Sequence, residues 1–221
     1  MYLEQNLKGI CKKNGIDFED FLSDLEVDHV NEITLFDLEA IAEEYEYDMQ
    51  ALLFQAIYPV EPWLKKAKAI RLLVLDVDGV MTDGGMYFTE NGDQIKKYNT
   101  KDGMAIRQLT KEGFPIAIIS SGFTNHVVQE RAKMLEIKYC YVGREEKITI
   151  LKNYCEELGI SLKEVAMIGD DINDLKVFEE IGLRVCPKDA VSKVKSKADI
   201  ILKSKGGEGC VREFIDEYLR P

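Results

Sequence analysis

From residue 69 onward, short apolar segments alternate with longer amphipathic segments, and this rhythm restricts the fold more than any other feature of the chain. The six apolar segments have the length of strands and lie at 70–75, 115–119, 138–142, 164–168, 183–186 and 198–202. The segments between and after them have helical apolar spacing and lie at 102–112, 124–136, 145–158, 173–181, 188–196 and 209–219. Buried strands separated by helices predict an α/β fold, a doubly wound parallel sheet covered on both faces.

Segment 84–100, GGMYFTENGDQIKKYNT, interrupts this rhythm with alternating apolar and polar residues. Its Asn91-Gly92 dipeptide suits the left-handed positions of a type I′ turn. We therefore expect a β-hairpin inserted between the first strand and the first helix of the sheet.

The first sixty residues have the pattern of several short helices and precede the α/β region. The expected N-caps of the second, third and fourth helices are Asp17, Thr34 and Asp48. The apolar spacing places Leu35 on the buried face of the third helix. Pro59 and Pro62 then break the helical pattern and mark a linker. We predict a small all-α domain at 1–62 and the α/β domain at 66–221.

Charge separates these two predicted domains as clearly as pattern does. Residues 1–60 contain three basic and fourteen acidic side chains, whereas the remainder contains 26 of each, and the whole chain has a net charge of −11. An acidic domain repels a phosphate backbone, so we expect no nucleic-acid partner. The stretch ITLFDLEAIAEEYEYDMQALLF is similar to the later helices of repressor-like helix-turn-helix domains, but its charge favours docking or oligomer contacts over DNA binding.

The cysteines and the apolar runs indicate a cellular compartment. The five cysteines are scattered and form no C-x-x-C pair, which favours free thiols in a reducing environment. No apolar run approaches the roughly 18 residues that span a bilayer. The first residues also lack the apolar core of a signal peptide. We therefore expect a cytoplasmic protein with no membrane partner.

Polar side chains follow four consecutive predicted strands. Asp76 and Asp78 come directly after the first strand, and Ser120-Ser121-Gly122 ends the second. Lys147 opens the helix after the third strand, and Asp170-Asp171 follows the fourth. Ligands of open parallel sheets bind beyond the carboxyl ends of the strands. Each of these residues alone is commonly a helix cap or a solvated side chain, but their joint placement predicts one polar site.

These residue types fit phosphoryl transfer. Clustered carboxylates repel one another unless a cation lies between them, and a set of oxygen ligands favours Mg²⁺. One carboxylate can attack phosphorus and form an aspartyl-phosphate. A second carboxyl group two residues further on can protonate the leaving alkoxide. A serine, a lysine and backbone N–H groups would hold the phosphoryl oxygens.

The same segments resemble a known family. DVDGVMTDG, SSG, Lys147 and GDDIND are similar to the four signatures of the haloacid dehalogenase superfamily of phosphotransferases, and the resemblance covers residues 69–221. YNTKDGMAIR and GGEGCVREF are similar to segments of a cap-less branch, the 3-deoxy-D-manno-octulosonate (KDO) 8-phosphate phosphatases and their sialic-acid-type 9-phosphate relatives. In that branch the hairpin and the tail help to close the site in a tetramer, so the resemblance implies a homotetramer.

The resemblance also implies a role for each site residue. Asp76 would be the nucleophile and Asp78 the acid/base. Mg²⁺ would be held by Asp76, the Asp78 backbone carbonyl, Asp170 and, through water, Asp171. The phosphoryl group would be bound by Ser120, Gly122 and Lys147, and the carboxylate of a sugar acid by Lys101 and Arg107.

Two positions depart from the branch and concern the sugar rather than the phosphate. Phe123 stands where an arginine is common, and Glu208 stands where a basic residue is common. The resemblance implies KDO 8-phosphate as the substrate, and these two departures keep a nine-carbon sialic-acid-type 9-phosphate as the alternative. A regulatory or binding protein on the same scaffold is the alternative of another class. A signalling receiver is disfavoured, because it carries its acidic pair and phosphoacceptor in a different strand order.

Overall fold

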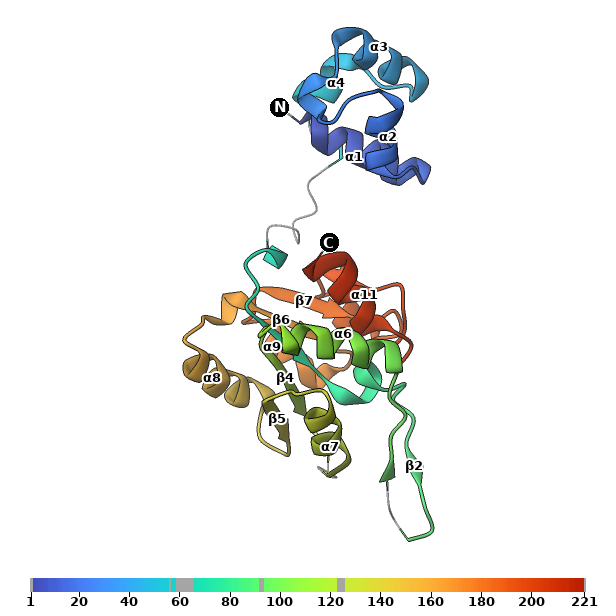
Figure 1. Ribbon diagram of the computed structural model, residues 1–221. Coiled ribbons are helices and arrows are strands. Elements are labelled where there is room, and N and C mark those ends of the chain that lie inside the picture. The colour runs from blue at the N-terminus through green and yellow to red at the C-terminus, as the bar shows by residue number, and fades with distance from the viewer. Residues whose placement is uncertain (1, 56, 59–65, 92–93, 123–125, 221) are drawn as a thin grey trace. The chain divides into compact units, whose positions relative to one another are not determined.

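The computed structural model describes residues 2–55, 57–58, 66–91, 94–122 and 126–220. Contacts within the chain divide it into two compact units, Met1–Pro62 and Trp63–Pro221 (Figure 1). We call them the helical unit and the sheet unit.

The helical unit consists of short capped helices. Its described elements are α1 (Leu3–Asn14), α2 (Phe18–Asp24), the 3-10 turn η1 (Val30–Glu32), α3 (Leu35–Glu44) and α4 (Met49–Phe54). The predicted caps are confirmed, because the side chains of Asp17, Thr34 and Asp48 accept backbone N–H groups at the starts of α2, α3 and α4. Gly15 follows α1 with a φ of +70°, a conformation that glycine adopts without a Cβ penalty.

One face of each helix forms the core of the helical unit. Its most deeply buried side chains include Leu7, Ile10, Phe21, Leu22, Leu38, Ile41 and Leu52. The prediction that Leu35 is buried is wrong, since 67% of this residue is exposed. Leu35 is the first residue of α3 and lies before the packed face of the helix, which begins at Leu38.

The sheet unit is built on six parallel strands. They are β1 (Leu72–Leu75), β4 (Ile116–Ser120), β5 (Tyr139–Val142), β6 (Val165–Ile168), β7 (Leu183–Cys186) and β8 (Ile200–Ile201). Their spatial order is β5-β4-β1-β6-β7-β8, and every neighbouring pair is parallel. The chain therefore winds outward from β1 in both directions. The predicted α/β class and all six strands are confirmed, with ends within two residues of the predicted positions.

Helices cover both faces of this sheet (Figure 1). On one face α6 (Thr100–Lys111), α7 (His126–Met134) and α11 (Cys210–Phe214) pack with Leu73 and Leu75 of β1. On the other face α8 (Lys147–Leu158), α9 (Leu175–Phe178) and α10 (Ser192–Lys195) pack with Leu72 and Val74. Successive residues of β1 thus alternate between two buried cores.

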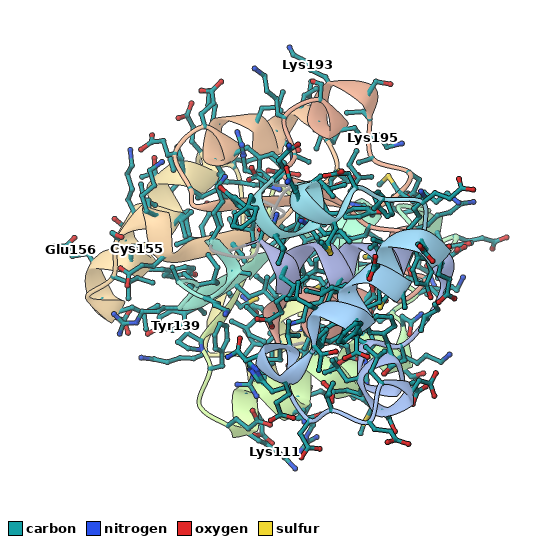
Figure 2. The ribbon with its side chains drawn as sticks, turned by 90° about the horizontal axis from the view of Figure 1, so that it is seen from above. Lys111, Tyr139, Cys155, Glu156, Lys193 and Lys195 are labelled. Carbon is teal, nitrogen blue, oxygen red and sulfur yellow. The ribbon has the colours of Figure 1, made fainter. Side chains whose placement is uncertain are left out.

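The outer sides of these covering helices face solvent. Glu156 of α8 and Lys193 of α10 are exposed, and Figure 2 shows both side chains pointing outward at the edge of the view. The neighbouring Cys155 is buried. Among the described residues, no helix has both the length and the apolar character needed to cross a membrane.

Two predicted helices differ from the structure for local reasons. α6 begins at Thr100 rather than at residue 102, because the Asn99 side chain accepts backbone N–H groups at its start. The helix predicted at 188–196 is reduced to α10. The N–H groups of Lys188 and Val191 donate instead to the carbonyl groups of Ser204 and Asp170, so residues 188–191 follow a turn.

The remaining helix predictions hold with shifted ends. The segment predicted at 173–181 forms η4 (Ile172–Asp174) and the short α9, and the segment predicted at 209–219 forms α11 and η5 (Ile215–Leu219). The helix predicted at 145–158 begins at Lys147. Residues 124 and 125 of the helix predicted at 124–136 lie outside the described residues.

The predicted hairpin is present, but its register differs from the expectation. β2 (Tyr87–Phe88) pairs antiparallel with β3 (Gln94–Ile95), and Phe88 lies opposite Gln94. A two-residue turn at Asn91-Gly92 would place Phe88 opposite Ile95. Residues 89–93 therefore join the strands, and residues 92–93 of this connection lie outside the described set. The hairpin projects from the sheet unit (Figure 1).

Candidate active site

A cavity of about 630 Å³ lies at the carboxyl ends of β1, β4 and β6. Because the three strands are parallel neighbours, the residues that follow them meet at one edge of the sheet. The lining residues include most of the predicted site: Asp76, Asp78, Ser120, Gly122, Asp170 and Asp171. Lys147 does not line the cavity, but it contacts Asp76 from beneath the cavity wall, as described below.

The loop after β1 fits tightly against the loop after β6. Gly79 has a φ of +84°, and a Cβ atom on it would lie 2.0 Å from Asp170 Oδ2. Glycine is therefore required here both by the backbone conformation and by the space. This close approach brings Asp170 beside the Asp76–Asp78 segment.

The tail near the C-terminus supports the same loop. A Cβ atom on Gly206 would lie 2.0 Å from the carbonyl oxygen of Gly79. The N–H of Gly207 donates to the carbonyl of Val80 at 2.9 Å. The Asn99 side-chain amide donates to the Gly207 carbonyl at 3.1 Å, which ties the start of α6 to the tail. Within this chain the GGEG segment thus acts as a backbone support for the site loop.

Lys147 lies between two buried carboxylates. Its Nζ is 2.9 Å from Asp76 Oδ1 and 2.7 Å from Asp174 Oδ1, and only 3% of its side chain is exposed. Asp174 Oδ2 accepts the N–H groups of Asp170 at 2.9 Å and Asp171 at 3.4 Å. Asp174 therefore fixes both the lysine and the loop after β6. We assigned no role to Asp174 from the sequence, although it ends the GDDIND segment.

The carboxyl groups of this cluster are difficult to ionise together. Burial, and then the charge of Asp174, raise the pKa of Asp76 to about 7, although Lys147 opposes the shift. Burial, and then the charge of Asp76, raise the pKa of Asp170 to about 8. Burial disfavours the charge on Lys147, but Asp76 and Asp174 outweigh it and raise the pKa of this ammonium group. A divalent cation would relieve the repulsion among the carboxylates.

The donor set fits such a cation. Carboxylate oxygens of Asp76, Asp170 and Asp174 lie within 4.8 Å of one another. Asp170 Oδ1 is buried and has no hydrogen-bond partner among the described residues. Both oxygens of Asp174 already accept hydrogen bonds, so Asp76 and Asp170 are the carboxylates best placed to bind Mg²⁺ directly. Asp171 instead accepts the N–H of Ile172 at 2.7 Å at the start of η4.

Ser120 and Gly122 line the cavity at the end of β4. Ser120 is the last residue of β4 and is buried, and its Oγ accepts the N–H of Gly122 at 3.3 Å. A hydroxyl group and backbone N–H groups at a strand end are suited to phosphoryl oxygens. Phe123, which departs from the family pattern, lies outside the described residues.

The predicted substrate residues Lys101 and Arg107 are not brought to the cavity of this chain. Both are exposed on α6, and neither is among the described lining residues. The Arg107 guanidinium pairs with Glu136 at 2.8 Å and donates to the Met134 carbonyl. Within this chain the charge of Arg107 is used in this contact after α7, and the sugar-carboxylate roles of Lys101 and Arg107 stay predictions. Glu208 is exposed in the tail.

The hairpin supplies cavity residues that the sequence analysis missed. Met86, Phe88, Gln94 and Lys96 line the cavity together with the strand-end residues. The ammonium group of Lys96 forms an ion pair with Asp78. The alternation of the hairpin residues was visible in the sequence, but which side faces the site depends on the register and on how the hairpin leaves the sheet.

The fold and these side chains define a haloacid dehalogenase-like hydrolase, and the profile of that family matches residues 143–215. The KDO 8-phosphate phosphatase of Salmonella typhimurium is 39% identical over 162 residues, which cover 73% of this chain and 86% of the relative. The phosphatase of the same name from Escherichia coli K12 is 39% identical over 156 residues, 71% of this chain and 82% of the relative.

A solved structure agrees with these relatives. The KDO 8-phosphate phosphatase from Moraxella catarrhalis, in complex with magnesium, phosphate and KDO, has a TM-score of 0.70 and 33% identity, and covers 73% of this chain and 92% of that chain. The chain belongs to the family of the KDO 8-phosphate phosphatases. The predicted superfamily and the predicted class of enzyme, a phosphomonoesterase, are confirmed.

Proposed function

We propose that this chain is a Mg²⁺-dependent phosphatase that hydrolyses a sugar-acid phosphate monoester, with KDO 8-phosphate as the expected substrate. The observation that carries the proposal is the arrangement of Asp76. Its carboxylate lies in the cavity wall, 2.9 Å from a buried lysine ammonium and within 4.8 Å of a carboxylate oxygen of Asp170, whose Oδ1 has no hydrogen-bond partner in the described part of the chain. With Lys147 beside it and Mg²⁺ bound by Asp76 and Asp170, this carboxylate would be suited to attack an anionic phosphate.

In the proposed reaction, Asp76 acts as the nucleophile. A carboxylate oxygen of Asp76 forms a bond to phosphorus while the bond from phosphorus to the sugar oxygen breaks, which gives an aspartyl-phosphate and the free alcohol. Asp78 gives a proton to the leaving oxygen. Asp78 then takes a proton from the water that attacks the aspartyl-phosphate, and Asp76 and inorganic phosphate are released.

The proposed phosphoryl contacts come from the end of β4 and the start of α8. Ser120 Oγ and the N–H of Gly122, which contact each other at 3.3 Å in this chain, would turn to donate to phosphoryl oxygens. Lys147 would neutralise charge on the phosphoryl side while it holds Asp76 in place. Once they hold the phosphate, donors fixed at the site reorganise less during the reaction than water does, which is the main advantage of such a site.

The proposed metal ligands are Asp76 and Asp170 directly, the Asp78 backbone carbonyl, and Asp171 through water. Bound Mg²⁺ would supply charge neutralisation and help to orient the phosphate. The buried, unpartnered Asp170 Oδ1 supports this assignment. Binding of Mg²⁺ would also explain how Asp76 and Asp170, whose carboxyl pKa values are raised, can be ionised near neutral pH.

The choice of sugar rests on the relatives. Two of them are named as KDO 8-phosphate phosphatases, and the Moraxella structure contains KDO. Phe123 and Glu208 differ from the pattern that the resemblance implies, so a nine-carbon sialic-acid-type 9-phosphate is the second candidate substrate.

We also infer a homotetramer of about 101 kDa from four chains of 25.2 kDa. The exposed apolar side chains of the hairpin, Met86, Tyr87, Phe88 and Ile95, support contacts between subunits. The five free cysteines support a cytoplasmic location.

Phosphate release from a panel of phosphate esters tests the proposal. The panel contains KDO 8-phosphate, a sialic-acid-type 9-phosphate and neutral sugar phosphates of similar size, each with Mg²⁺ and with excess chelator. We expect the highest kcat/KM on KDO 8-phosphate and no turnover with chelator. Equal rates on all esters would contradict the sugar-acid assignment. A chain that turns over none of them would favour the regulatory or binding alternative.

A further inference from the structure

The hairpin places one lysine against the proposed acid/base. Lys96 follows β3, and its Nζ pairs with Asp78 Oδ1. Only 4% of the Lys96 side chain is exposed, whereas 41% of the Asp78 side chain is exposed. Among the described residues that line the cavity, Lys96 is the only one with a positive charge.

The adjacent lysine, Lys97, does not share the contact with Asp78. Lys97 points to the other side of the extended segment, as successive side chains do. Its side chain is 68% exposed and pairs with Asp83 at 3.1 Å. The two lysines therefore differ in position but not in chemistry, which makes Lys97 a matched control for Lys96.

Asp78 has few other contacts that fix its carboxylate. Among the described residues, the only other side chain that donates a hydrogen bond to the Asp78 carboxylate is Thr82. Its Oγ1 is 3.4 Å from Asp78 Oδ1, which is long for a hydroxyl donor. A carboxylate that is two-fifths exposed would otherwise sample several rotamers. The ion pair with a nearly buried ammonium group therefore sets the position of the Asp78 carboxylate in the cavity.

We propose that Lys96 is a positioning residue: it holds the Asp78 carboxyl group where it reaches the leaving oxygen of the substrate. The proposal rests on the proposed phosphatase function, in which Asp78 protonates the leaving alcohol. If Lys96 positions Asp78, the hairpin contributes to catalysis through this lysine. Loss of Lys96 impairs departure of a poor leaving group and leaves phosphate binding intact.

Leaving-group dependence separates this role from others. An alkoxide needs a proton from Asp78 to leave, whereas p-nitrophenolate leaves without one. General acid catalysis typically contributes about 10²- to 10⁴-fold. We expect Lys96→Met to lower kcat on KDO 8-phosphate by about 10- to 100-fold, with KM changed less than about threefold, because misplacing Asp78 loses part of that contribution. The same variant should keep the single-turnover rate of p-nitrophenolate release within about threefold, because that step needs no proton from Asp78, whereas hydrolysis of the shared aspartyl-phosphate slows equally for both substrates. Lys96→Arg should restore most of the activity on KDO 8-phosphate, and Lys97→Met should match the wild type on both substrates.

Three results would overturn the proposal. An equal loss in the single-turnover rate of leaving-group release from both substrates would mean that Lys96 only maintains the structure. A raised KM for KDO 8-phosphate with unchanged kcat would mean that Lys96 binds the sugar carboxylate instead. No change on either substrate would mean that the ion pair is dispensable. If Lys96→Met does not fold, as judged by circular dichroism, Lys96→Gln is measured in its place under the same criteria. A wild-type chain that hydrolyses p-nitrophenyl phosphate but no sugar phosphate would refute the proposed function without bearing on Lys96.

Discussion

Lys147 Nζ lies 2.9 Å from Asp76 Oδ1, with both side chains almost fully buried at the carboxyl ends of the strands. Asp174 holds the same ammonium group from the other side at 2.7 Å. The ammonium group of Lys147 thus lies between two carboxylates whose negative charges would otherwise repel each other. The contact links stability to function, because the group that neutralises the cluster also orients the proposed nucleophile.

Removing that cation should cost both stability and activity. Lys147→Met leaves Asp76 and Asp174 buried without their partner, so we expect the free energy of unfolding to fall by about 3–5 kcal/mol and phosphate release to be lost. Lys152→Met is the matched control on α8, because Lys152 is exposed and its ion pair among the described residues is with Glu180, at 3.0 Å. It should change stability by less than about 0.5 kcal/mol. Urea denaturation measures both variants. Equal stabilities for the two would contradict the role given to the buried pair.

Gly79 allows a test of the close approach between the two site loops. Gly79→Ala introduces a Cβ at a φ of +84° and 2.0 Å from Asp170 Oδ2. Gly113→Ala introduces one at a φ of +80° with nothing within 4 Å. Both should lose about 1–2 kcal/mol from backbone strain. Only Gly79→Ala should also displace Asp170, with kcat reduced at least about tenfold. Kinetics that are the same in the two variants would show that the Gly79–Asp170 contact is not needed.

Asp199 should make stability depend on pH in the acid range. Burial raises its pKa, but hydrogen bonds from Arg184 and Lys66 outweigh burial and hold the pKa of Asp199 below its usual range. A depressed carboxyl pKa contributes stability above the unfolded value of about 3.9, and this contribution is lost as pH falls through the folded value. Asp199→Asn should therefore be less stable than the wild type by about 1–3 kcal/mol at pH 6, and the difference should shrink below about pH 4. Chemical denaturation at pH 3 to 7 measures it; a difference that grows in acid would contradict this sign.

The helical unit is expected to be dispensable for turnover. Every proposed catalytic group lies in the sheet unit, which has its own cores. The excess of negative charge in the first sixty residues is screened beyond about 8 Å at physiological salt. A chain of residues 66–221 should keep kcat within a few-fold at matched salt. If it is folded and has the same oligomeric state but loses a hundredfold in kcat, the helical unit contributes to the site and the proposed division is wrong.

Most of the sheet could be predicted from the sequence, because the apolar run that marks each strand is a local pattern. Each strand is a continuous apolar run, and β1 is buried on both faces, as such runs require. Non-local hydrogen bonds explain the main errors. Residues 188–191 have helical spacing, but their N–H groups find partners in Ser204 and Asp170. The spacing of α3 likewise gave no sign that Leu35 lies before the packed face.

The same division holds for the site. Asp76, Ser120 and Asp170 follow parallel neighbouring strands, so topology alone brings them together. Asp174 and Lys96 act through side-chain pairs whose partners lie far away in the sequence, and neither pair has a local pattern. The roles of Lys101 and Arg107 were implied by resemblance only, and the contacts of Arg107 in this chain lead to Glu136.

The central claim, that Asp76 attacks phosphorus, is tested most directly by trapping the aspartyl-phosphate. The chain is mixed with KDO 8-phosphate and Mg²⁺, quenched within one turnover and treated with borohydride, which reduces an acyl phosphate to the alcohol and converts the aspartate to homoserine. Peptide mass spectrometry then locates the modified residue. We predict homoserine at position 76, dependent on substrate and absent from Asp76→Asn, which should also release no phosphate. Phosphate release without modification at Asp76, or modification at Asp78 instead, would contradict the account.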